Sequence, residues 1–242
     1  MSADATATTE LPAFADVPAG TLPGGTPTGG FRLSVVPTTV GQYWHYLVDQ
    51  DLHRRAAPHL HGFPAGGGTG LRATPAGTVE LDEELARLPV TGVTWVGSVA
   101  YCEWVGNQLG APCRLPTAAE WHYAAAGPRG LRWALGDDFD RKTYAPAASG
   151  PRPVGATSAN AFGLRDMTGN VFEWCADPVT APESAGGGAL GSRVIKGGAY
   201  TVRNPESFEN ATVFSADELS TVPYIGFRVL YKFRVFGDAS SD

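Results

Sequence analysis

The chain has 242 residues, of which 43% are hydrophobic, and a formal net charge of −6. This length fits one domain with long loops, and the negative charge argues against nucleic acids and anionic membranes as partners. No apolar run approaches the roughly 20 residues that span a bilayer. Residues 1–14 lack the basic and apolar regions of a secretory signal. We therefore expect a cytoplasmic protein that binds neither nucleic acid nor membrane.

The first part of the chain combines a polar start with a strand and a helix. Residues 1–15 are small and polar, which predicts a disordered tail before a single domain over residues 16–236. Residues 31–36 have the composition of a short strand. Thr39 is suited to cap a helix over residues 40–50, whose apolar side chains recur at helical spacing.

The middle of the chain contains a long loop and two further helices. Residues 51–78 are rich in His, Pro and Gly, and loops of this length in a compact domain are often functional. A short acidic helix is expected over residues 81–88. Helices are predicted over residues 95–109, ended by Gly110, and over residues 118–126, where Thr117 and Glu120 have capping-box spacing.

The last part of the chain is rich in turns. We predict loops over residues 128–192 and strands over residues 193–195 and 224–236. The fold class is therefore α+β, loop-rich, with a small antiparallel sheet and about three helices. The three cysteines, Cys102, Cys113 and Cys175, are an odd number, which favours free, buried thiols over a disulfide framework.

Four motifs follow one another along the chain. They are PVTGVTW with AYCEW (residues 89–104), RLPTAAEW with YAA (114–125), FGLRDMTGNVFEW (162–174), and KGGAY with GFR (196–228). In this order they resemble the formylglycine-generating enzyme and sulfatase-modifying factor family, over about residues 16–231. The resemblance implies a C-type lectin-like fold. In such a fold we expect Arg114 and Glu120 to pin loops by charge-assisted hydrogen bonds.

The resemblance also implies a calcium site. Asp166, Gly169, Val171 and Glu173 match positions that hold one calcium ion in the family, two by side-chain and two by backbone oxygens. Oxygen ligands from an irregular loop suit this ion. The alternative is that Asp166 and Glu173 make local hydrogen bonds without a metal.

The chain departs from the family where the family binds copper. Formylglycine-generating enzymes use two cysteines just after the Gly-Gly segment, and here Val202 and Ser207 stand in their places. Without thiolates that segment offers no soft ligands for Cu(I). Generation of formylglycine is therefore not expected.

A second branch of the family uses non-heme iron held by histidines. Here His59 and His61 lie two residues apart in the long loop, with His53 nearby. Two histidines and a carboxylate can hold Fe(II). The alternative is a solvated loop whose histidines have no fixed geometry.

The segment after Gly197-Gly198 is the expected recognition surface, because the family places its active groove there. The candidate ligand-binding residues are Arg203, Asn204, Glu206 and Asn210, with His59 and His61 on a possible lid. Arg203 is the strongest of them, since a guanidinium grips a carboxylate or phosphate with two hydrogen bonds.

Three functions fit the sequence. The first is an oxidative or tailoring enzyme that acts on a small molecule in bacterial secondary metabolism. The second is a non-catalytic ligand-binding module, such as a variable protein of a diversity-generating retroelement. The third is an accessory scaffold protein.

Overall fold

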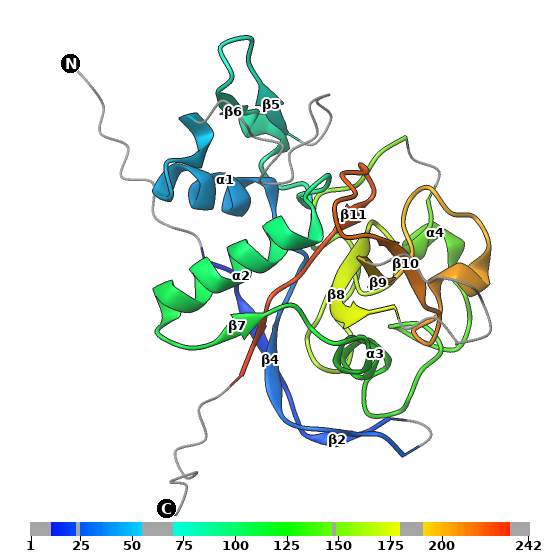
Figure 1. Ribbon diagram of the computed structural model, residues 1–242. Coiled ribbons are helices and arrows are strands. Elements are labelled where there is room, and N and C mark those ends of the chain that lie inside the picture. Colours follow the sequence, from blue (N-terminus) through cyan, green and yellow to red (C-terminus); the bar gives the residue numbers. More distant parts are fainter. Residues whose placement is uncertain (1–10, 23–24, 55–69, 147–148, 180–190, 233–242) are drawn as a thin grey trace, which may run out of the picture.

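The computed structural model describes residues 11–22, 25–54, 70–146, 149–179 and 191–232. The fold class is α+β, of the C-type lectin-like type, as expected. Its elements are short and joined by long loops (Figure 1). The helices are α1 (Val40–Asp49), α2 (Trp95–Leu109), α3 (Ala118–Ala126) and α4 (Arg141–Tyr144), and single 3-10 turns are η1 (Leu52–Arg54), η3 (Glu83–Leu85) and η4 (Pro205–Phe208).

The first four-stranded sheet joins the two ends of the domain. Its order is β1 (Phe14–Val17), β4 (Phe31–Ser34), β12 (Leu230–Tyr231) and β7 (Cys113–Arg114). All of its pairs are antiparallel. In β1, Phe14 and Ala15 pair with Ser34 and Leu33, so the prediction of a disordered tail over residues 1–15 is wrong at its C-terminal end.

The second four-stranded sheet lies toward the side of the molecule that carries α4 (Figure 1). Its order is β10 (Phe214–Asp217), β9 (Ser192–Lys196), β8 (Phe172–Pro178) and β11 (Ile225–Gly226). The β8–β11 pair is parallel, so the sheet is mixed rather than purely antiparallel. Two small hairpins complete the strands: β2 (Gly20–Thr21) with β3 (Pro27–Thr28), and β5 (Leu71–Ala73) with β6 (Val79–Leu81).

The three long helices begin where the sequence predicts, because their caps are local; α2 and α3 also end there, and α1 ends one residue earlier than predicted. Thr39 and Gln42 form a complete capping box, as do Thr117 and Glu120. Gly110 ends α2 at a φ of 65°, in the left-handed region that glycine adopts without steric cost. None of the helices in the described part of the chain is long and apolar enough to cross a membrane.

Three predicted elements need correction. The acidic helix expected over residues 81–88 is only the 3-10 turn η3, preceded by strand β6. The strand expected over residues 224–236 is split into β11 and β12, and residues 233–236 lie outside the described part. Strand β8 was expected to be loop. Its first four residues are all buried, so its sequence lacks the polar–apolar alternation of a half-exposed strand.

Large aromatic side chains fill the space between these short elements. Trp121 and Trp174 are fully buried, and the rings of Tyr43, Tyr101 and Phe227 contact one another. Arg114 makes the predicted contact with Glu120 through two hydrogen bonds of 2.7 Å. Cys102, Cys113 and Cys175 are free and buried, as expected.

Candidate functional site

The segment with the predicted calcium ligands is held by protein donors. Asp166 is buried at a φ of 55°, and its Oδ1 accepts a hydrogen bond of 3.0 Å from the Thr157 amide. Its Oδ2 accepts from the Gly155 amide. Asp166 therefore ties the loop before it to the FGLRDMTGN motif.

Glu173 is the partner of a buried arginine. Its Oε1 accepts from Arg228 Nη2 at 2.8 Å, and its Oε2 accepts from Arg228 Nε and Trp121 Nε1, each at 2.7 Å. The side chains of Glu173 and Arg228 are 1% and 0% exposed. Arg228 also donates to the carbonyls of Ser34 and Arg165, so it links three distant segments.

These contacts do not fit a calcium site made of Asp166, Gly169, Val171 and Glu173. Glu173 Oε2 accepts two hydrogen bonds and so has no lone pair left for a metal, whereas the other three carboxylate oxygens accept one hydrogen bond each. A calcium ion on Glu173 would also place a second cation against the Arg228 guanidinium. The geometry supports the alternative, in which the two carboxylates make local contacts without a metal.

The Gly-Gly turn brings the chain close to its neighbours. Gly197 and Gly198 have φ values of 95° and 76°. A Cβ on Gly198 would strike the Phe208 ring, so only glycine fits there. The chain then passes through Val202 and Ser207, where the resemblance puts the family's copper-binding cysteines.

The thiols that the chain does have are poor substitutes for those cysteines. Burial raises the pKa of Cys102 and of Cys175 well above the ordinary value, and it raises the pKa of Cys113 to about 11. Because of these raised pKa values, all three thiols are protonated near neutral pH. The thiolate, which is the form that reacts and binds metals, is therefore scarce.

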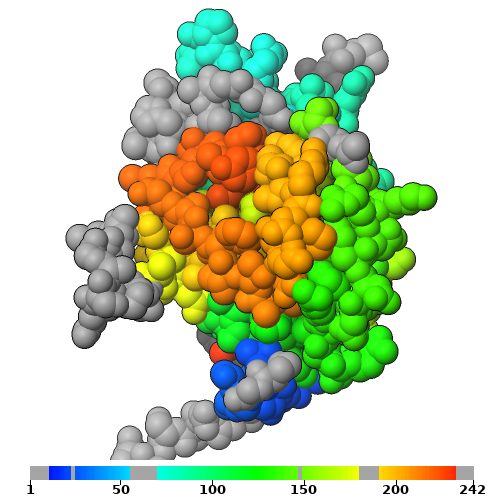
Figure 2. Space-filling view, turned by 90° about the vertical axis from the view of Figure 1, so that its right-hand side faces the viewer, coloured from blue at the N-terminus to red at the C-terminus, as the bar shows by residue number. Residues whose placement is uncertain are grey.

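A cavity of about 410 Å³ lies beside the turn that carries Arg203. We call it the Arg203 pocket; it is lined by Arg141, Lys142, Ala145, Pro146 and Arg203. Arg141 and Lys142 belong to α4, which packs against the segment after the Gly-Gly turn. In Figure 2 the segment around residues 200–220, drawn in orange, covers the middle of this face and borders the green segment that contains α4.

The other residues expected in a binding groove lie apart from this pocket. The Asn204 side chain accepts from the Glu206 amide and so caps η4. Glu206 is exposed and within electrostatic range of Arg132. Asn210 is 0% exposed, so its role as a surface ligand group is corrected to a structural one. His59 and His61 lie outside the described residues.

Asn210 helps to hold Lys196, a buried charge that sequence reasoning missed. Lys196 Nζ donates to the carbonyls of Asn210 and Thr212, each at 2.8 Å, and lies 5.6 Å from the centre of the Trp121 ring. Burial lowers the pKa of Lys196 to about 8, and burial next to this lysine lowers the pKa of His122 to about 4. The sequence signal that could have revealed this buried charge is the position of the lysine, directly before Gly-Gly at the end of a strand.

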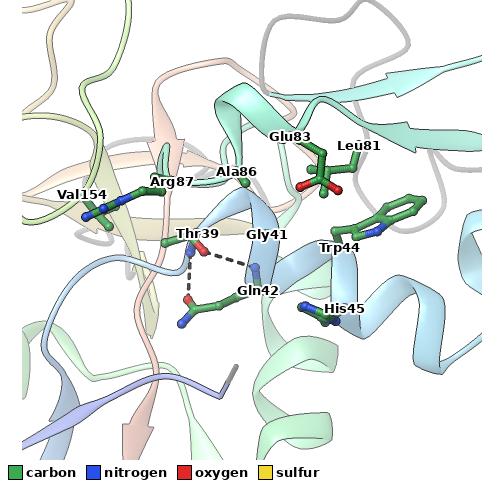
Figure 3. A pocket seen from close by; sticks show the side chains of 10 residues that line it. All are labelled: Thr39, Gly41, Gln42, Trp44, His45, Leu81, Glu83, Ala86, Arg87 and Val154. Atoms are coloured by element: carbon green, nitrogen blue, oxygen red, sulfur yellow. Dashed lines mark hydrogen bonds between the residues drawn. The ribbon is translucent and has the colours of Figure 1, made fainter. Parts of the chain in front are cut away.

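A larger cavity, about 660 Å³, lies between α1 and η3 (Figure 3). Trp44 and His45 from α1 and Glu83 and Arg87 from the η3 region line it. The Thr39 and Gln42 side chains at its edge bond to each other's backbone, as the dashed lines show, so they are committed to the helix cap. None of the residues that line this cavity belongs to the Gly-Gly segment.

The described side chains offer no further metal site. They contain no group of three or more His, Cys, Asp or Glu side chains placed to hold a metal ion. His53 lies with its Nδ1 3.3 Å from the Leu47 carbonyl oxygen and its ring against Trp44. Since His59 and His61 lie outside the described residues, the two alternatives for them, an iron site or a solvated loop, both stay predictions.

Comparison with known proteins supports this description of the fold. The serine/threonine-protein kinase pkn1 of Chlamydia caviae is 38% identical over 136 residues, which are 52% of this chain and 21% of the kinase. The formylglycine-generating enzyme of Streptomyces coelicolor is 34% identical over 139 residues, 46% of this chain and 42% of that enzyme. This chain thus spans less than half the length of either relative.

A solved structure, that of CarF, shares the fold with a TM-score of 0.69. It is 21% identical, and the match covers 92% of this chain and 99% of that one. Residues 14–233 match the family described as the sulfatase-modifying factor enzyme 1-like domain. Together with the four motifs in their order, this match means that the chain belongs to the sulfatase-modifying factor family, to which the formylglycine-generating enzymes also belong.

Proposed function

We propose that this chain recognises a small polar molecule in the Arg203 pocket and does not generate formylglycine. One observation carries the proposal: Arg203 follows the Gly-Gly turn and lines a cavity with α4, while Val202 and Ser207 replace the copper-binding cysteines. The pocket volume of about 410 Å³ falls within the range of small-molecule sites.

We place a tailoring enzyme of bacterial secondary metabolism first among the functions that use this pocket. Support comes from the 34% identity with a formylglycine-generating enzyme, a family relative that acts chemically. A binding module that leaves its ligand unchanged is the second candidate, favoured by the absence of thiols at positions 202 and 207. Both candidates need the same recognition site.

The experiment is a thermal-shift screen of anionic, neutral and cationic metabolites against the wild type. A true ligand should raise the melting temperature of the wild type and of Arg129→Gln, but not that of Arg203→Gln. Arg129 is exposed and lies outside the Arg203 pocket, so its variant removes the same charge elsewhere. A ligand that stabilises all three proteins equally would place the recognition site elsewhere.

Mass spectrometry of the recovered ligand then separates the two candidates. A change in its mass that requires this protein supports the tailoring enzyme. Recovery of the unchanged molecule, under aerobic conditions and with Fe(II) or Cu(I) added, supports the binding module.

A further inference from the structure

Three cationic side chains surround the Arg203 pocket, and its lining holds no acidic residue. Arg141, Lys142 and Arg203 are exposed, and in the described part of the chain none of them forms a salt bridge. The chain as a whole carries a net charge of −6, so such a gathering of cations departs from its average surface.

Other arginines of the structure show the contrast. Seven arginines outside the pocket pair with acidic side chains: Arg32, Arg54, Arg72, Arg114, Arg132, Arg193 and Arg228. Four others in the described part of the chain form no salt bridge, namely Arg87, Arg129, Arg152 and Arg165, but none of them lines the pocket. The carboxylate next to the pocket, that of Asp140, points to its own turn. It accepts from the Lys142 amide at 3.0 Å and from the Thr143 hydroxyl at 2.5 Å. The Thr143 hydrogen bond and, to a smaller extent, the charge of Lys142 lower the pKa of Asp140, so this carboxylate offsets part of the pocket's positive charge without forming a salt bridge.

The two guanidinium groups are anchored in place by backbone carbonyls. Arg141 Nη2 donates to the Arg203 carbonyl at 2.9 Å, and Arg203 Nη1 donates to the Tyr200 carbonyl at 3.0 Å. Arg141 also lies 5.7 Å from the centre of the Phe139 ring. Each guanidinium has five N–H groups, so one anchoring bond leaves most of them for a ligand while reducing the side-chain entropy lost on binding.

Two guanidinium groups and one ammonium group exceed what a single carboxylate uses. A carboxylate has one charge and is satisfied by one bidentate arginine. A phosphate monoester carries about 1.5 to 2 negative charges near pH 7 and has three acceptor oxygens. Three cationic donors around one cavity match that group, and the apolar surfaces of Ala145 and Pro146 suit the remainder of an organic molecule.

We propose that the Arg203 pocket binds the phosphate group of a small phosphorylated molecule, through Arg141, Lys142 and Arg203. This assignment rests on the proposed recognition function of the same pocket and names the chemical class of its ligand.

The test measures binding of inorganic phosphate at low ionic strength by calorimetry. The wild type and the matched control Arg129→Gln should bind phosphate with the same affinity. Arg203→Gln and Arg141→Gln should each bind at least about tenfold more weakly, and added salt should weaken binding to the wild type. Since these side chains are exposed, circular dichroism should show all variants folded. If either variant fails to fold, Lys142→Gln replaces it. The ammonium group of Lys142 makes no hydrogen bond or salt bridge to the described residues, so its removal should not disturb the fold.

Equal phosphate affinity in the wild type, Arg203→Gln and Arg141→Gln would overturn the inference, as would no phosphate binding to the wild type. A neutral or cationic metabolite whose binding is lost in Arg203→Gln would also overturn it, yet would leave the proposed recognition function standing. A phosphorylated ligand that binds all variants equally would count against both. If the protein bound citrate but not phosphate, the ligand class assigned to the pocket would change from a phosphorylated molecule to a polycarboxylate.

Discussion

Four charged residues that are at most 1% exposed lie around strands β8 and β9: Asp166, Glu173, Lys196 and Arg228. Their charges sum to zero, and each has polar partners within the protein. Because an unpaired buried charge costs several kcal/mol, removal of one member should harm the fold more than removal of a surface charge. At the scale of single residues, these four side chains connect loops that have few backbone hydrogen bonds to each other.

Glu173→Gln should lower the free energy of unfolding by about 3–5 kcal/mol, because it leaves the Arg228 guanidinium buried without its counter-charge. The matched control is Glu80→Gln, which breaks an ion pair with Arg72 whose side chains are 54% and 69% exposed and should cost less than about 1 kcal/mol. Urea denaturation of both variants checks this. Equal losses would show that the buried pair contributes no more than a surface pair.

Calcium removal should leave the melting temperature unchanged, because Asp166 and Glu173 already have protein donors on every carboxylate oxygen. A ligand that binds only the native state at a hundredfold excess over its dissociation constant would add about 2.7 kcal/mol of stability. Melting curves of dialysed protein with chelator and with added calcium provide the measurement. A melting temperature that falls with chelator and recovers with calcium, but not with magnesium, would restore the calcium prediction.

Lys196 should give the stability a distinctive pH dependence. Burial lowers its pKa from 10.5 to about 8, so between these values the unfolded chain binds a proton that the native protein does not. Stability contributed by this group therefore rises with pH across that window, by roughly 3 kcal/mol.

The measurement is the difference in the free energy of unfolding between the wild type and Lys196→Met at pH 8 and pH 10.5. As the pH rises, the wild type should gain stability relative to Lys196→Met. Buried tyrosines such as Tyr43 and Tyr101 have raised pKa values and titrate at high pH in both proteins, so their effect cancels in the difference. A difference that stays flat would mean that Lys196 keeps its ordinary pKa.

At the scale of elements, sequence reasoning succeeded where the signal is local. The predicted caps Thr39 and Thr117 marked the starts of two helices, because each contact joins residues three apart. It failed at β8, whose burial depends on partners elsewhere in the chain. Only part of the pocket could be predicted from the sequence. Arg203 was expected in a groove, but Arg141 lies 62 residues earlier in the chain, and only the fold brings α4 against Arg203.

Strand β11 depends on a glycine that admits close backbone packing. A Cβ on Gly226 would lie 2.8 Å from the Val90 carbonyl oxygen and 3.3 Å from a Val171 methyl group. Gly226→Ala should therefore lower the free energy of unfolding by about 1–3 kcal/mol through overpacking. Gly29→Ala is the control, because a Cβ there meets nothing within 4 Å. Thermal unfolding of the two variants compares them, and similar stabilities would show that β11 shifts without cost.

At the scale of the whole molecule, the chain keeps the family's framework and changes its reactive turn. The motifs that bury Trp121, Trp174 and Arg228 hold the fold together and are present. What differs lies on the face shown in Figure 2, around the orange segment near residues 200–220. Framework and chemistry are thus carried by different residues, so membership of the family fixes the fold and leaves the reaction open.

The same separation predicts that the protein does not convert a cysteine peptide to formylglycine. Val202 and Ser207 offer no thiolate for Cu(I), and Cys102, Cys113 and Cys175 are buried in other segments with raised pKa values. Copper-treated protein would be incubated aerobically with a sulfatase-type cysteine peptide, beside the formylglycine-generating enzyme of Streptomyces coelicolor as a positive control. Mass spectrometry should detect the aldehyde only in the control reaction. Aldehyde formed in proportion to the concentration of this protein, and abolished by Cys113→Ala, would mean that a thiol outside the Gly-Gly segment has taken over the copper site.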